Sequence, residues 1–161
     1  MNDSLTKNAR RIQDAIEKRG FDFIVRELPQ STRTAADAAK AIGCEVGQIA
    51  KSLIFKDLDT ENPLLAVVSG ANQVDTDKLA AVGAGHPATA DAKFARASSG
   101  FSIGGIPPFG HRQTIRTFID EDLLRFDRIW AAAGTPNAVF EMDPSALLPL
   151  TLGVICELKR D

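Results

Sequence analysis

Apolar residues follow a helical period in the first part of the chain. Between residues 4 and 19 they recur every three or four positions, at Leu5, Ala9, Ile12 and Ile16. This spacing places them on one face of an amphipathic helix. Ser4 is suited to cap the N-terminus of that helix, and Gly20 is suited to end it. We therefore predict a helix over residues 4–19.

Segments rich in β-branched and aromatic residues follow this helix and predict strands. They lie at residues 21–28, 49–56, 64–70, 113–119, 128–134 and 137–142, with a last apolar run at residues 153–158. The second and third of them flank the polar turn DLDTENP. This arrangement predicts an antiparallel hairpin with a long connecting loop.

Further helices are expected between the strands, each with recognisable boundary residues. They run from Ser31 or Thr34 to Gly43, from Asp75 or Thr76 to Gly83, and from Asp91 to Gly100, and a proline-started helical turn spans residues 144–150. Strands outnumber the helical crossovers that a doubly wound sheet would need. The predicted fold class is therefore α+β, a single domain over residues 1–161 with a mixed, largely antiparallel sheet and peripheral helices.

The segment FSIGGIPPFGH, residues 101–111, suits neither a helix nor a central strand. Glycine tolerates positive φ and lets another molecule approach the backbone, whereas proline fixes φ and removes an amide donor. The composition predicts a stiff, irregular loop. Either its remaining amides face outward and hold a carbonyl or an oxyanion, or the loop is a rigid turn between two strands.

Composition and charge narrow the function classes. The 161 residues are 44% hydrophobic and 25% charged, which is typical of one globular domain. A net charge of -2 argues against nucleic-acid binding by overall charge, although the first helix is rich in basic residues. These either form a solvated face or contact phosphate. They are Lys7, Arg10, Arg11, Lys18 and Arg19.

Little in the sequence favours a metal, a cofactor or a membrane. The chain has two histidines, and its two cysteines, Cys44 and Cys156, lack metal or redox spacing. The acidic run at residues 120–122 is predicted to be a solvated helix cap rather than a metal site. The N-terminal residues lack the apolar segment of a secretory signal, and no stretch is long enough to span a membrane. We expect a cytoplasmic protein without metal or cofactor.

Three side chains are candidates for chemistry but leave alternatives open. Lys51 shares a strand face with Leu53 and Phe55, so it either covers the core with its stem or carries its ammonium to a pocket mouth. His111 suits a general base, but no serine and carboxylate pattern accompanies it. It is predicted to fix the loop or to contact a nucleotide. Trp130 either packs in the core or stacks on a base.

Three motifs in order, IAKSLIF, GGIPPFGH and GTPNAVFEMDP, resemble the YbaK/prolyl-tRNA-synthetase-associated domain family. The resemblance covers most of the chain. It implies a small mixed α/β protein that hydrolyses wrongly charged aminoacyl-tRNA, acting free in solution or as an insertion within a synthetase. It also implies a reaction without a side-chain nucleophile, in which a ribose hydroxyl of the terminal adenosine, or the substrate side chain, assists attack on the ester.

The resemblance places functional roles on particular residues. The family lysine of the form A-K-[ST]-aliphatic corresponds to Lys51, and the family G-x-x-x-P loop corresponds to Gly104 through Pro108. The implied catalytic residues are Lys51, Gly104, Gly105 and Ile106. The implied substrate-binding residues are Phe101, Pro107, Pro108, Gly110, His111, Gly134, Thr135, Pro136 and Asn137. Pro107 is an additional proline that removes one amide donor, and no fixed role is carried onto His111 or Asn137.

The leading functional hypothesis is a deacylase that acts in trans on a small amino acid wrongly attached to tRNA. Its partner is the acceptor end of an aminoacyl-tRNA, and a synthetase or an elongation factor is a further candidate partner. The alternative is a non-catalytic protein that binds a tRNA end, a nucleotide or a peptide in the same pocket. A metal-dependent hydrolase is disfavoured by the scarcity of histidines.

Overall fold

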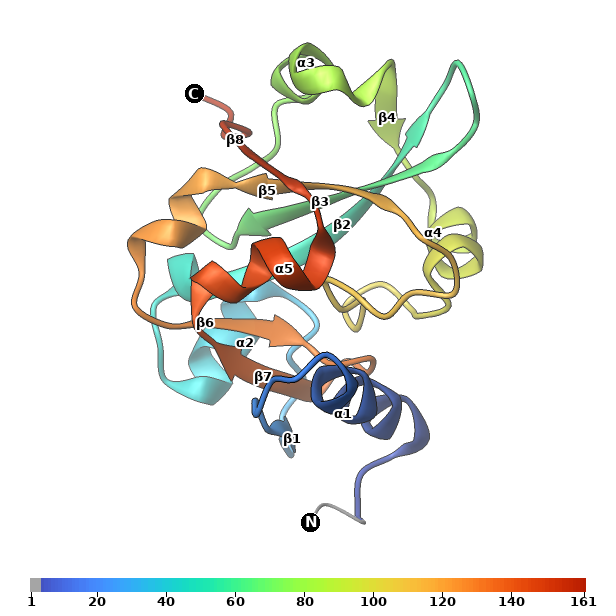
Figure 1. Ribbon diagram of the computed structural model, residues 1–161. Coiled ribbons are helices and arrows are strands. Elements are labelled where there is room, and N and C mark those ends of the chain that lie inside the picture. Colours follow the sequence, from blue (N-terminus) through green and yellow to red (C-terminus); the bar gives the residue numbers. More distant parts are fainter. Residues whose placement is uncertain (1–3) are drawn as a thin grey trace.

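A computed structural model describes residues 4–161, and this part of the chain forms one sheet with helices packed around it (Figure 1). The strands are β1 (Val25–Glu27), β2 (Ile49–Asp57), β3 (Pro63–Ser69), β4 (Pro87–Thr89), β5 (Arg116–Asp120), β6 (Ile129–Ala132), β7 (Ala138–Met142) and β8 (Val154–Cys156). The α-helices are α1 (Lys7–Lys18), α2 (Ala35–Ile42), α3 (Thr76–Leu79), α4 (Ala92–Ser99) and α5 (Leu147–Thr151). Short 3-10 turns cover η1 (Val46–Gln48), η3 (Glu121–Arg125) and η4 (Pro144–Ala146), and the π-turn η2 (Ala80–Ala84) follows α3.

The sheet mixes parallel and antiparallel pairs, which confirms the predicted α+β class. Its strand order is β1-β7-β6-β2-β3-β5-β8, and β4 pairs with β2 outside this path. The predicted hairpin is present, because β2 and β3 pair antiparallel from Ala50 opposite Ser69 to Lys56 opposite Pro63. In the described residues, three of the pairs are parallel, namely β2 with β6, β3 with β5 and β5 with β8.

The boundaries of α2 and α4 follow the residues that predicted them, whereas α1 begins at Lys7, after Thr6 rather than after Ser4. The side chain of Thr34 accepts a hydrogen bond from the amide of Asp37 at the start of α2, and Asp91 does the same for α4. Gly43 and Gly100 end these helices with φ of 86°. Left-handed φ costs glycine little, so both helices stop where the sequence indicated.

Several details differ from the sequence prediction. The strand expected at residues 21–28 is reduced to the three residues of β1, and β4 was not expected at all. The helix expected to run to Gly83 loosens after α3 into the π-turn, in which Gly83 has φ of 105°. Asp120 does cap η3, but it is buried rather than solvated, with 1% exposure. It accepts hydrogen bonds from the amide of Ser69 and the side chain of Asn72, which satisfy the buried carboxylate.

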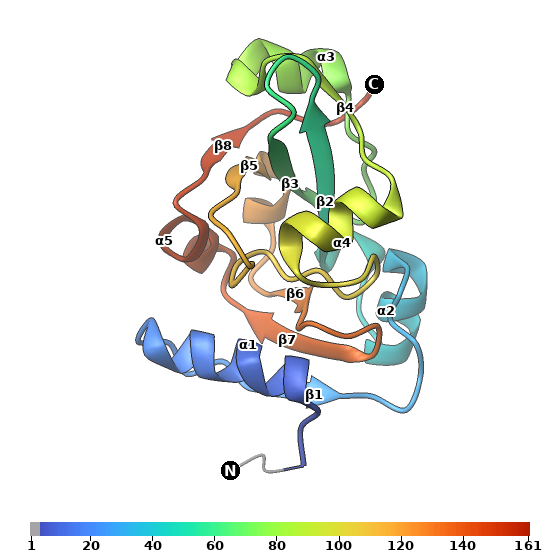
Figure 2. The ribbon, with the colours of Figure 1, turned by 90° about the vertical axis from the view of Figure 1, so that its right-hand side faces the viewer.

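The core occupies both faces of the sheet because successive strand residues point in opposite directions. Leu65 and Val67 of β3 belong to the larger cluster, which also includes the apolar face of α1. Leu64, Ala66 and Val68 belong to a second cluster on the other face. Figures 1 and 2 show α1 beside β7 at one end of the molecule and α3 at the opposite end. Over residues 4–161, the structure contains no helix of the length and apolar character needed to cross a bilayer.

Candidate active site

The sheet has a gap along one edge of β2. β2 pairs with β3 over most of its length, but on its other side it meets β6 only at Ile49 and Ala50 and β4 only at the far end, from Phe55. The amide of Gly70 donates to the carbonyl of Ile49 at 2.7 Å. In an antiparallel pair every second residue bonds to the same neighbour, so Ile49, Lys51 and Leu53 direct their backbone groups toward β3. The amide and carbonyl of Ser52 therefore face the gap rather than β3.

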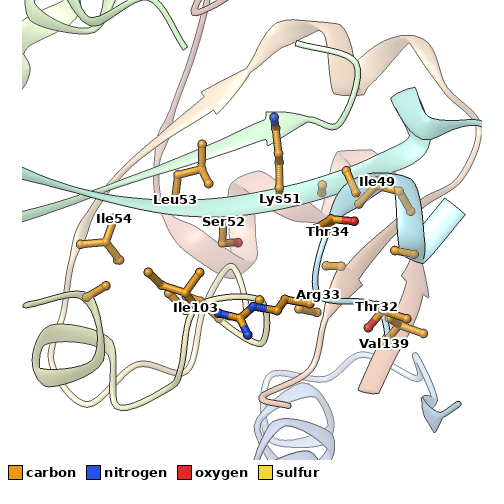
Figure 3. Close-up of a pocket in the computed structure, with 18 of the residues that line it drawn as sticks. Thr32, Arg33, Thr34, Ile49, Lys51, Ser52, Leu53, Ile54, Ile103 and Val139 are labelled. Carbon is orange, nitrogen blue, oxygen red and sulfur yellow. The ribbon is translucent and has the colours of Figure 1, made fainter. Parts of the chain in front are cut away.

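A pocket of about 440 Å³ lies against this gap (Figure 3). Its walls come from the edge of β2, the start of α2, the segment before and within α4, the loop after α4, and β6 and β7. Many of the lining residues are small and apolar, including Ala35, Ala38, Ala50, Ala131 and Ala132. The charged side chains among the described lining residues are Arg33 and Lys51, and no carboxylate accompanies them. The pocket therefore has a positive character and suits a ligand group with negative or partial negative charge.

Ser52 brings a polar group without a partner to this pocket. Its side chain points from β2 toward the side that holds Arg33 and Ile103 (Figure 3). Its Oγ is buried, and no described residue forms a hydrogen bond with it. Buried hydroxyls in proteins are almost always hydrogen-bonded, so an unpaired one in a pocket wall is available to a ligand.

Lys51 rises from the opposite face of β2, as the alternation of strand residues predicted (Figure 3). It still lines the pocket, and its side chain is half-buried. Burial lowers the pKa of Lys51, and the negative charge of Asp120 partly opposes that shift. The ammonium of Lys51 is therefore a partly desolvated cation on the face of β2 opposite the side chain of Ser52.

The glycine-proline loop closes the pocket opposite β2, and Ile103, Gly104 and Ile106 line it. The amide of Gly105 donates to the carbonyl of Ser102 at 2.9 Å, and the carbonyl of Gly105 accepts from the amide of Gly134 at 2.9 Å. A Cβ on Gly105 would lie 2.8 Å from the backbone carbon of Thr135. Gly105 is therefore a contact between two backbone segments, and its own amide is already used.

The turn at residues 134–137 supports the loop from behind. Its backbone carbonyl at Pro136 accepts from the amide of Thr32 at 2.6 Å, and the side chain of Asn137 donates to the carbonyl of Leu28 at 3.0 Å. Thr135 donates its hydroxyl to the side chain of Asn137. These bonds fix the connection between β1 and α2, which supplies Thr32, Arg33 and Thr34 to the pocket.

His111 fixes the other end of the loop. Its Nε2 lies 2.7 Å from the carbonyl oxygen of Pro107, and the residue faces a second cleft rather than the pocket. Burial lowers the pKa of His111, and the nearby positive charge of Arg19 acts in the same direction, while the bond to Pro107 opposes both. The imidazole is therefore held neutral near pH 7 and donates to Pro107.

The lowered pKa of His111 predicts a pH dependence of stability. Below about pH 6.5 an unfolded chain protonates this histidine while the folded chain resists protonation, so the free energy of unfolding falls as the pH falls. His111→Gln retains a donor but does not titrate. We expect urea unfolding at pH 7 and pH 5 to show a smaller loss of stability in the variant than in the wild type. Equal losses would contradict this assignment.

The structure separates the residues that the sequence placed together. Lys51, Gly104 and Ile106 line the pocket, whereas Gly105 and residues 134–137 lie behind its wall. Phe101 is buried in the core, with 1% exposure. Pro108, Gly110 and His111 line the second cleft, which also measures about 440 Å³. Pro107 accepts the hydrogen bond of His111.

Ser52 and Arg33 are among the pocket residues that the sequence did not predict for the site. Ser52 lies within the AKSL motif, in which only the lysine was given a role. Arg33 comes from the connection before α2, and nothing in the sequence distinguishes it from an ordinary surface arginine. Trp130 also lines the pocket, is buried with 8% exposure, and stacks with the guanidinium of Arg26 at 5.3 Å. In the part of the chain that the structure describes, no cluster of three or more histidine, cysteine or acidic residues could hold a metal.

A mixed sheet with a gap at β2, a pocket whose charged lining residues are basic and a closing glycine-rich loop define a small α+β domain. Residues 29–150 match the family model described as the aminoacyl-tRNA editing domain. The chain belongs to this family.

Relatives of the chain agree with this assignment. It is 31% identical over 126 residues to a protein of Enterococcus faecalis (strain ATCC 700802 / V583) named "Putative Cys-tRNA(Pro)/Cys-tRNA(Cys) deacylase EbsC", with 78% of this chain and 76% of the relative covered. A crystal structure described as a "putative trans-editing enzyme for prolyl tRNA synthetase" is 45% identical, has a TM-score of 0.90, and is matched over 98% of this chain and 99% of the other. The hypothetical protein APE2540, at 24% identity and a TM-score of 0.87, shares the fold, over 93% of this chain and 99% of the other.

Proposed function

We propose that this protein hydrolyses the ester between a small, wrongly attached amino acid and the terminal adenosine of a tRNA. The observation that carries the proposal is the unpaired hydroxyl of Ser52 in a pocket whose charged lining is positive. Such a site favours the negative charge that develops on the carbonyl oxygen during ester hydrolysis. Membership of the editing-domain family supports the substrate class. Charged tRNA is a cytoplasmic substrate, so the proposed activity belongs to that compartment.

The proposed reaction is attack of water on the carbonyl carbon of the ester. The electron pair of the carbonyl moves onto oxygen, and the resulting oxyanion accepts hydrogen bonds from the hydroxyl of Ser52 and from loop amides. Gly104 and Ile106 supply those amides, because the amide of Gly105 is bonded to Ser102. Rotation about the Cα–Cβ bond of Ser52 turns its hydroxyl toward the open side of the strand. Collapse of the intermediate returns the electron pair to the carbonyl carbon and breaks its bond to the ribose oxygen. That oxygen takes a proton from the attacking water, so the ribose hydroxyl and the free amino acid are released.

We assign the activation of the attacking water to the substrate itself. Neither a histidine nor a carboxylate is present among the described residues that line the pocket. A ribose hydroxyl of the terminal adenosine lies next to the ester by covalent geometry, so it can orient the attacking water without help from a side chain. The same reaction needs no metal and no cofactor.

The alanine-lined walls select a small amino acid. One methylene in an apolar pocket is worth about 1–3 kcal/mol, so we expect preference rather than strict exclusion among small side chains. The test is release of free amino acid from tRNA charged with alanine, serine, threonine, cysteine or proline. Faster release from one or two of the small residues than from proline is expected. No release from any of the five esters would contradict the proposed function.

A non-catalytic binding protein is the second candidate. The absence of histidine and carboxylate from the described pocket lining is what such a protein would also show. It would take up the charged tRNA end and protect the ester from spontaneous hydrolysis. A synthetase or an elongation factor that delivers the tRNA is a partner compatible with either function.

Lys51 is proposed to bind the terminal nucleotide at the pocket edge through a phosphate or ribose oxygen. Lys51→Ala is therefore expected to lower kcat/KM for deacylation at least tenfold. Because the side chain is only half-buried, the melting temperature should change by no more than a few degrees. Lys56→Ala removes a cation from the same strand outside the pocket and serves as the matched control. An unchanged kcat/KM in Lys51→Ala would show that Lys51 does not bind the substrate.

A further inference from the structure

Four arginines gather along the glycine-proline loop although they come from separate parts of the chain. Arg11 and Arg19 belong to α1 and its C-terminal end, Arg33 to the connection before α2, and Arg112 to the end of the loop itself. All four are exposed. We call them the loop arginines.

Each loop arginine packs against the loop or its first residue. The guanidinium of Arg11 lies 5.0 Å from the ring centre of Phe101, and that of Arg19 lies 4.9 Å from the ring centre of Phe109. The side chain of Arg33 occupies the space where a side chain on Gly104 would stand. The Cβ of Arg112 lies 3.5 Å from the position of a Cβ on Gly100. The four arginines therefore lie against the loop or beside its ends, and two of them stack their guanidinium groups on its aromatic rings.

The charge of these arginines is not neutralised within the described part of the chain. None of the four forms an ion pair among residues 4–161, although Arg10 on the same helix pairs with Asp14. The loop from residue 100 to residue 112 contains no acidic residue. A local excess of four positive charges on a protein of net charge -2 indicates an anionic partner at this place.

The loop arginines connect the pocket to the second cleft. Arg33 lines the pocket at one end, and Arg19 and Arg112 line the cleft at the other. The cleft is polar, with His111, Gln113 and Thr114 in its walls and no carboxylate among its described lining residues. A ligand that begins in the pocket and continues along the loop would meet a positive charge at each stage.

We propose that the loop arginines bind the phosphodiester backbone of the RNA that leads to the esterified nucleotide. The proposal rests on the proposed deacylase function, because that function places the last nucleotide in the pocket. The preceding phosphates then follow the loop from Arg33 toward Arg112 and Arg19. Arginine is suited to this role because its planar guanidinium donates two parallel hydrogen bonds to one phosphate.

The test is the binding of fluorescently labelled, uncharged tRNA at several salt concentrations. Each phosphate neutralised on a single strand contributes about 0.7 to the slope of log affinity against log salt. We expect the double variant Arg11→Ala/Arg112→Ala to bind at least tenfold more weakly at low salt and to reduce the slope by about 1.5. The single variant Arg112→Ala breaks no contact with an aromatic ring. It should reduce the salt slope by about half as much as the double variant does.

The matched control is Arg125→Ala/Lys159→Ala, which removes the same charge away from the loop. Arg125 pairs with Asp122, and Lys159 is two residues from the C-terminus, which Figure 1 shows at the end of the molecule opposite α1. If the slope of log affinity against log salt is the same in the control and in the loop double variant, the loop arginines do not bind the RNA backbone. That outcome is separate from a failure of the proposed function, because binding of uncharged tRNA does not depend on ester hydrolysis.

Discussion

Ser52→Ala is expected to lower the kcat of deacylation about a hundredfold without lowering the stability of the protein. Loss of one oxyanion donor typically costs a factor of 10² to 10³ in kcat. The stability should stay the same or rise, because the substitution removes a buried hydroxyl that has no partner in the described protein. The measurements are steady-state release of amino acid and urea unfolding of the two proteins.

Ser69→Ala gives the matched control for this result. Ser69 lies opposite Ala50 on β3, and its hydroxyl is also buried but donates to the carbonyl of Gly47 at 2.7 Å. Its removal should cost about 1–2 kcal/mol of stability and leave kcat close to that of the wild type. Ser52→Thr keeps the hydroxyl and should recover most of the activity. If Ser52→Ala loses stability while kcat is unchanged, the hydroxyl is structural.

Gly105→Val is expected to destabilise the protein by about 1–3 kcal/mol and to reduce deacylation. The first added carbon would already lie within 3.0 Å of three backbone atoms of Thr135. Backbone atoms cannot rotate away as a side chain can, so the loop or the turn at residues 134–137 must move. Movement of the loop displaces Gly104 and Ile106, which line the pocket. Thermal unfolding and kcat/KM measure the two effects.

Ala97→Val is the control for Gly105→Val because Ala97 lies on the exposed face of α4, close to the loop in sequence. The added carbons there meet solvent, and we expect a change below about 0.5 kcal/mol. A Gly105→Val protein with the melting temperature and turnover of the wild type would show that contact between the two backbone segments is dispensable.

Local patterns predicted the elements well because each depends on neighbouring residues. The caps at Thr34 and Asp91 and the stops at Gly43 and Gly100 lie where the sequence placed them. The opposite directions of Lys51 and Ser52 also followed from strand alternation alone. The α+β class with a mixed sheet was predictable because the locally predicted strands outnumber the helical crossovers between them.

The site itself depends on contacts that no local pattern contains. The gap at Ser52 exists because β6 and β4 pair with the two ends of β2 and leave its middle open. Residues 134–137, which are predicted to bind substrate, form hydrogen bonds to Gly105, Leu28 and Thr32 and are not among the described residues that line the pocket. Asp120 was predicted to be solvated, and only the positions of Ser69 and Asn72 show why it is buried. Such partners are distant in sequence and near in space.

The central claim is that the pocket hydrolyses the ester rather than only holding it. The most direct measurement is the amount of amino acid released when mischarged tRNA is present in about hundredfold excess over the protein. We expect many molecules of amino acid to be released per protein molecule, at a lower rate in Ser52→Ala and in Lys51→Ala. Release that stays at the spontaneous rate or falls below it, while tRNA binds, would show that the protein binds the ester without hydrolysing it.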